Sequence, residues 1–172
     1  MMAVDISSAD GALLVSLLRL LHIVASVIWV GAALLMTMYI EPMAAGSGAG
    51  FLRHLYRDTS LRRLVPLSAL VTTVAGLLLY EMLGYSGALG NPTGLTLTAG
   101  ASFGLLAFLH GLFAVWRPAG RYAGALRSAG ADEAELTRME DKIRRNGRVS
   151  MWLAMISLIL MAGARYIGPI LG

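Results

Sequence analysis

The chain has 172 residues, of which 57% are hydrophobic and 14% are charged, and its mean hydropathy is +0.70. Because soluble domains carry about 25% charged residues, this composition predicts an integral membrane protein, with no nucleic acid as partner despite the net charge of +4. The chain contains no cysteine, which excludes disulfides, thiolate metal sites and haem attached through C-x-x-C-H. We expect a single membrane domain over residues 1–172.

Four apolar stretches divide the chain. A hydrocarbon core about 30 Å thick requires roughly 20 apolar residues in a helix. The stretches that meet this length are 13–39, which ends before Glu41-Pro42, then 64–83, then 95–116, which ends before Arg117-Pro118, and finally 149–171. The predicted fold is therefore all-α, an integral membrane four-helix bundle.

The basic residues predict how the bundle is oriented. Four of the fourteen lie between the first two stretches, eight lie between Arg117 and Arg148, and the connection 84–94 has none. By the positive-inside rule, the loops 42–63 and 117–148 are cytoplasmic and both termini lie outside. We expect a bacterial inner membrane protein with periplasmic termini.

The two basic loops also carry helical patterns. Residues 51–63 alternate apolar and arginine side chains, which predicts a short amphipathic interfacial helix between the first two spanning helices. Residues 131–146 predict a charged helix with Leu136, Met139 and Ile143 on one side, leading into 149–171 with a break or kink at Gly147.

Helical spacing predicts which faces are turned to the interior. In the first helix the polar and small stripe comprises Arg19, His22, Ser26, Trp29, Ala33 and Met36. In the fourth helix we expect the matching stripe to comprise Met151, Met155, Leu158, Ala162 and Arg165. The pair Gly100 and Gly104 is a small-xxx-small pattern that predicts close helix packing.

His22 is the first candidate for chemistry, because ionisable groups inside a membrane are costly and are usually paired or functional. One hypothesis is that neutral His22 ligates haem iron, while Arg19 and Arg165 bind the haem propionates at the membrane edge. Trp29 would pack beside the macrocycle or line the helix interface. The alternative is that both arginines snorkel to the interface, that Glu81 pairs with one, and that His22 donates a structural hydrogen bond.

The other histidines and the methionines extend these alternatives. His110 lies about half a membrane away from His22 in depth, so the two should not clamp one iron. His110 is either a structural residue or a second metal site. A sixth ligand for iron at His22 would be Met161 or a solvent molecule. A copper-handling site would combine His22 with Met36, Met151, Met155 and Met161, since His and Met suit Cu(I), although methionine also fills ordinary apolar cores.

The run Leu21–Gly31, LHIVASVIWVG, resembles the first membrane helix of a set of small bacterial proteins. That set includes the membrane part of copper-resistance-D-type (CopD) proteins and haem-binding protoporphyrinogen oxidases of the HemJ type. In these proteins a His, a Trp seven residues later and a Gly two residues further open the helix, as do His22, Trp29 and Gly31 here. The resemblance implies that His22 is a haem ligand.

Further along the chain, the resemblance continues less specifically. Arg62-Arg63-Leu64, followed by Pro66 and Thr72-Thr73, is similar to the entry of the second helix, and Leu109-His110 ahead of Trp116 is similar to the third. The oxidases carry a Lys early in the third helix, where this chain has Ala99. The resemblance therefore implies the fold and the haem site, and it does not carry over the oxidase activity.

Together these patterns predict a protein that binds b-type haem in the membrane and acts in electron transport or haem-linked redox chemistry. We assign no catalytic residues. The alternatives are a cofactor-free accessory subunit of a larger membrane complex and a copper-handling membrane protein. The expected partners are the lipid bilayer and either a larger membrane complex or further copies of this chain.

Overall fold

Helices make up nearly all of the structure, a computed structural model that describes residues 8–47, 53–54, 56, 61–87, 89–128 and 130–171. The helices are α1 (Ala9–Leu35), η1 (Met36–Ile40) and α2 (Glu41–Ser47), then α4 (Leu61–Met82) and η2 (Tyr85–Gly87), then α5 (Pro92–His110), η3 (Gly111–Trp116) and α6 (Arg117–Ala125), and α7 (Glu133–Leu171). No strand occurs in these ranges. The predicted all-α fold is confirmed.

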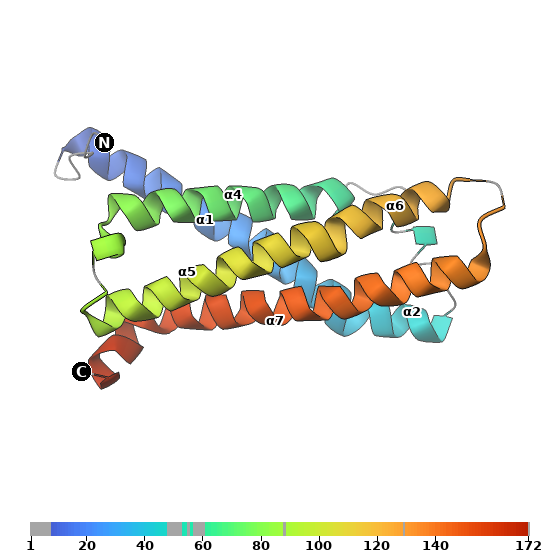
Figure 1. Cartoon of the computed structure of the whole chain (residues 1–172). Coiled ribbons are helices and arrows are strands. Elements are labelled where there is room, and N and C mark those ends of the chain that lie inside the picture. The colour runs from blue at the N-terminus through green and yellow to red at the C-terminus, as the bar shows by residue number, and fades with distance from the viewer. Residues whose placement is uncertain are drawn as a thin grey trace.

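Four helical runs are long and apolar enough to cross a membrane, as predicted: Ala9–Ala44, Arg63–Met82, Pro92–Ala125 and Glu133–Tyr166. The predicted interfacial helix 51–63 falls mostly outside the described residues. The start of α1 and the end of α7 lie at one end of the bundle, which we call the terminal end (Figure 1). The other end carries α2, α6 and the charged first part of α7, and we call it the basic end.

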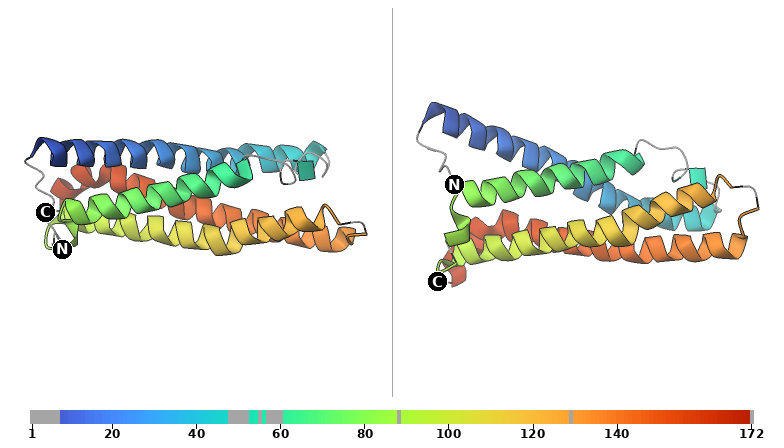
Figure 2. Two further views of the ribbon diagram at one scale, coloured as in Figure 1. Left: turned by 90° about the horizontal axis from the view of Figure 1, so that it is seen from above. Right: turned by 45° about the horizontal axis from the view of Figure 1, so that its top comes forward.

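The spanning helices pack mainly as two pairs of sequence neighbours, α1 with α4 and α5 with α7. Figure 2 shows that α1 crosses the bundle obliquely and is not parallel to α7. It lies beside α4 at the terminal end and approaches α7 at the basic end. The pairs meet where α4 contacts α5, with the Tyr80 hydroxyl 2.7 Å from Thr98 Oγ1. They also meet where Val30, Ala107 and Ala154 form a buried cluster. Beyond this point the terminal-end halves of α1 and α7 diverge (Figure 1).

Two predicted helix ends are wrong, because the chain continues as helix through Pro42 and through Pro118. In each case a π-helix comes directly before: the N–H of Glu41 donates to the carbonyl of Met36, and that of Arg117 donates to Leu112. A proline ring clashes with the carbonyl four residues earlier, and a local π-turn rearranges the backbone groups that the proline would leave unsatisfied. The helices therefore extend into the basic end as α2 and α6.

Small residues hold α5 against α7. A Cβ on Gly100 would lie 2.9 Å from Met161 Cγ and 3.3 Å from the Met161 backbone nitrogen, and a Cβ on Gly104 would lie 2.9 Å from Ser157 Oγ. The Ser157 hydroxyl donates to the Gly100 carbonyl at 2.7 Å. The close packing predicted for this glycine pair is confirmed.

The predicted interior face of α7 is wrong in its second half. Leu158, Ala162 and Arg165 are exposed, whereas Ala154, Ser157 and Ala164 are buried. Lipid is as apolar as leucine, so helix association in a membrane favours close contact between small residues over contact between large apolar ones. In addition, α7 passes through Gly147 without the predicted break.

At the basic end, α6 and the first part of α7 form a helical hairpin around a small core. Ala119 and Tyr122 from α6 pack against Leu136 and Ile143 from α7, with Met139 partly buried beside them. The predicted amphipathic helix over 131–146, with its apolar side, is confirmed. The loop predicted over 117–148 is thus largely helical.

Replacing Gly100 by Ala should lower the free energy of unfolding by about 1–3 kcal/mol, because overpacking of a tight contact costs this much. The matched control is Gly31→Ala in α1, where nothing lies within 4 Å of the added Cβ and where Ala is the better helix former. Thermal unfolding in one detergent compares the two. Equal stability of both variants would contradict the tight contact.

Candidate functional site

His22 lies on α1 against α4, and its position depends on a glycine. The ring is partly buried, and its Nδ1 lies 2.8 Å from the carbonyl oxygen of Thr72. A Cβ on Gly76 would lie 2.7 Å from His22 Cε1 and 2.9 Å from Nδ1. The imidazole therefore occupies space that any other residue at position 76 would fill.

This contact fixes the tautomer of the neutral ring. A carbonyl oxygen can only accept a hydrogen bond, so Nδ1 carries the proton and donates it. Nε2 then keeps its lone pair. Histidines that ligate metals are commonly oriented by such a bond from the other ring nitrogen to a backbone carbonyl.

The side chain of Thr72 adds an unsatisfied polar atom at the same place. Thr72 is 7% exposed, and its Oγ1 has no hydrogen-bond partner within the described part of the chain. Buried hydroxyls are usually satisfied, by protein or by ordered water. A single residue of α4 thus holds His22 through its carbonyl and carries an unpaired hydroxyl.

Arg19 and Arg165 lie at matching depths on different helix pairs. Each is eleven residues from the meeting point of α1 and α7, Arg19 before Val30 and Arg165 after Ala154. At 1.5 Å per residue this places both about 16 Å toward the terminal end. The two helices diverge there (Figure 1), and both arginines are exposed. Arg19 remains on the helix of His22, whereas Arg165 is carried away from it.

Trp29 and Met161 both pack within the protein. Trp29 contacts the cluster of Val30, Ala107 and Ala154, so it lines the interface between the helix pairs. Met161 packs over Gly100 in the interface of α5 and α7, and His22 packs on α4. Of the copper candidates on α7, Met151 is buried and Met155 packs on the same cluster as Trp29.

His110 forms a further polar contact between spanning helices. Its Nδ1 lies 2.8 Å from Ser150 Oγ on α7, and the π-helix η3 begins at the next residue. His110 is three residues past Ala107 toward the basic end, whereas His22 is eight residues from Val30 toward the terminal end. Their separation along the bundle is thus about 16 Å, in line with the predicted difference in depth.

No group of three or more His, Cys, Asp or Glu side chains that could hold a metal ion is found among the described residues. His22 and His110 belong to two separate contacts. Each has a hydrogen bond at Nδ1, His22 to a carbonyl and His110 to a hydroxyl.

The basic end holds a polar cluster between α2, α6 and α7. The Tyr122 hydroxyl, on a fully buried residue, donates to Glu140 Oε2 at 3.2 Å. Glu41 is 6% exposed, its Oε1 faces Gly147, and the charges of Arg144 and Arg148 attract it. Two buried carboxyl groups thus face a hydroxyl and two arginines.

Tyr56 contacts this cluster. The rings of Tyr56 and Tyr122 meet edge to face at a centroid distance of 5.6 Å. Burial raises the pKa of the Tyr56 hydroxyl, and the carboxylates of Glu41 and Glu140 raise it further, so Tyr56 stays a neutral donor. Sequence reasoning missed this cluster, although Glu140 shares the apolar side of its helix with Leu136 and Ile143.

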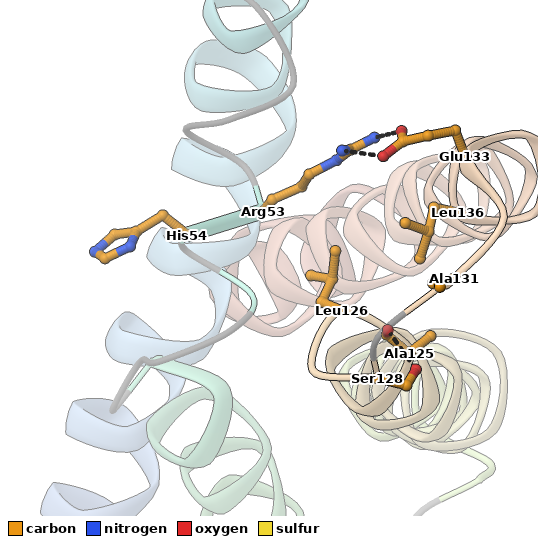
Figure 3. A pocket seen from close by; sticks show the side chains of 9 residues that line it. Arg53, His54, Ala125, Leu126, Ser128, Ala131, Glu133 and Leu136 are labelled. Atoms are coloured by element: carbon orange, nitrogen blue, oxygen red, sulfur yellow. Dashed lines mark hydrogen bonds and ion pairs between the residues drawn. The ribbon is translucent and has the colours of Figure 1, made fainter.

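Beside the cluster is an open pocket of about 440 Å³ (Figure 3). Arg53 crosses its rim and binds Glu133 through two hydrogen bonds, of 3.0 and 2.5 Å. The His54 ring points away from this pair in Figure 3. The pair ties the segment after α2 to the start of α7.

Comparison of the chain with protein-family models, with curated proteins and with solved structures found no match. The resemblance noted around His22 to Gly31 therefore remains an expectation from the sequence.

Replacing Tyr122 by Phe should lower the free energy of unfolding by about 1–3 kcal/mol, because the buried Glu140 loses a donor that water cannot replace. Tyr39→Phe is the control, since Tyr39 is 63% exposed. Chemical denaturation of the detergent-solubilised protein measures both. An equal effect of the two changes would show that the Glu140 contact contributes nothing.

A double-mutant cycle with His110→Ala and Ser150→Ala should give a coupling energy of about 0.6 kcal/mol, and at most about 1.7, as for other hydrogen bonds between membrane helices. The cycle subtracts the packing that each single change loses. A coupling energy indistinguishable from zero would contradict a stabilising hydrogen bond between His110 and Ser150.

Proposed function

We propose that this chain is a b-type haem-binding membrane protein, with His22 Nε2 as axial ligand of the iron, acting in electron transfer or haem-linked redox chemistry. The observation that supports this best is the 2.8 Å contact from His22 Nδ1 to the Thr72 carbonyl. It keeps the proton on Nδ1 and leaves Nε2 with the lone pair that a metal requires.

The neighbours of His22 fit this assignment in part. Gly76 leaves room for the ring, and the unpaired Thr72 hydroxyl is available to a bound group. Arg19, exposed and one helical turn toward the terminal end, would bind a propionate. Arg165 does not fit as the second propionate partner, because α7 diverges from α1 there (Figure 1). Haem bound at this position would supply a one-electron redox couple.

We further propose that the basic end faces the cytoplasm of a bacterial inner membrane. Arg63, Arg117 and Arg148 stand at the basic ends of three spanning helices, and such an excess favours the cytoplasmic side. The start of α1 and the end of α7 would then face the periplasm.

The second candidate is a cofactor-free subunit of a larger membrane complex. It is favoured by large apolar side chains of α1 and α4 that are exposed at 55–67%, among them Leu20, Val27 and Leu67. Either lipid or a partner helix can cover such faces. A second copy of this chain is one such partner.

The difference spectrum of the dithionite-reduced and the air-oxidised protein tests the haem assignment. For protein purified from haem-replete cells we expect b-type bands that are lost in His22→Ala and kept in His110→Ala, the matched control. Retention of the bands in His22→Ala would contradict His22 as the ligand. A colourless wild-type protein that co-purifies with larger partners in mild detergent would favour the cofactor-free subunit.

A further inference from the structure

The charged first part of α7 carries a row of arginines. These arginines are not part of the His22 site, and only some of them face the polar cluster. Arg138, Arg145 and Arg148, with Asp141 between them, follow helical spacing and share one side of the helix. They line, with Arg144, an open hollow of about 440 Å³. Four of its five side chains are arginines: Arg138, Arg144, Arg145 and Arg148.

The charge of this hollow is only partly compensated. Asp141 is its single acid, and it lies 3.8 Å from Arg144 Nη1, a long ion pair on an exposed surface. Arg144 and Arg148 also face the buried Glu41. Arg138 and Arg145 are exposed and form no ion pair with any described residue. The hollow therefore attracts anions.

The position of the hollow decides which anion it meets. Arg148 directly precedes Val149, where the apolar stretch of α7 begins. The headgroup layer on each side of the hydrocarbon core is about 5–8 Å thick. At 1.5 Å per residue, Arg145 lies about 5 Å and Arg138 about 15 Å from Arg148 along the helix axis. A long arginine side chain covers part of the distance back to the headgroup layer. The hollow thus starts within the layer of lipid phosphates.

We propose that this hollow binds the headgroups of anionic phospholipids, with Arg145 and Arg148 as the principal phosphate ligands. A guanidinium group can donate two parallel hydrogen bonds to two phosphate oxygens, whereas the lysine ammonium group cannot bind phosphate in this bidentate way. Four or more basic residues directly beside a spanning helix are typical of surfaces that bind anionic lipid. The bound headgroups would hold α7 at a fixed depth and compensate the arginines that Glu41 and Asp141 leave uncovered.

The test uses native mass spectrometry of the full chain in detergent, with phosphatidylglycerol or phosphatidylcholine added at equal concentration. The wild-type protein should retain phosphatidylglycerol preferentially. Arg145→Gln with Arg148→Gln should lower its affinity roughly tenfold or more, since each basic residue near an anionic surface contributes about 1 kcal/mol. The charge-matched control is Arg63→Gln with Arg121→Gln, exposed residues of α4 and α6 outside the hollow, which should keep the affinity.

Arg148 also acts on Glu41, so the double variant could lose stability. Arg138→Gln with Arg145→Gln keeps both arginines that face Glu41 and should still lose the preference. Equal loss in the control would show diffuse surface charge, and equal retention of the two lipids would show no headgroup site. Either result overturns the proposal. Inorganic phosphate that displaces the lipid at micromolar concentration would assign the hollow to a free anion and would likewise overturn it.

Discussion

The approach of α5 to α7 is set by two glycines, and it fixes the position of everything that α7 carries. Inside a bilayer, apolar surface alone gives helices no reason to associate, so they depend on close packing and on polar contacts between backbones and side chains. Gly100 and Gly104 permit the first, and the Ser157 hydroxyl bound to the Gly100 carbonyl supplies the second. The same register brings Ser150 to His110 and carries Glu140 to Tyr122 at the basic end.

Much of this architecture could be predicted from the sequence, because length and apolar composition determine which stretches can cross a membrane. The glycine pair was informative for the same reason that it matters physically. Two features could not be predicted. Pro42 and Pro118 indicate helix ends unless a π-turn precedes them. The neighbouring residues contain no sequence signal that predicts such a turn. The buried side of α7 was misassigned because large apolar residues suggest a core in water, whereas a membrane reverses that preference.

The candidate site likewise has parts that could be predicted from the sequence and parts that could not. His22 was identifiable, since an imidazole in an apolar helix requires a reason. Its partner was not, because a backbone carbonyl such as that of Thr72 has no sequence signature. Arg19 and Arg165 could be assigned a depth by counting residues, but their lateral separation depends on the angle between α1 and α7 (Figure 2). The role of Glu140 could have been predicted from the sequence, because a carboxylate on the apolar side of an amphipathic helix requires a partner.

The pairing of α1 with α4 and of α5 with α7 has a consequence for biosynthesis. Each pair joins helices that follow one another in the chain, so the first hairpin is complete once residue 82 has left the ribosome. Its internal contact, His22 with Thr72, needs nothing from the residues that follow. The second hairpin can then insert as its own unit. It docks on the first through the cluster of Val30, Ala107 and Ala154 and through contacts of α4 with α5, such as that of Tyr80 with Thr98.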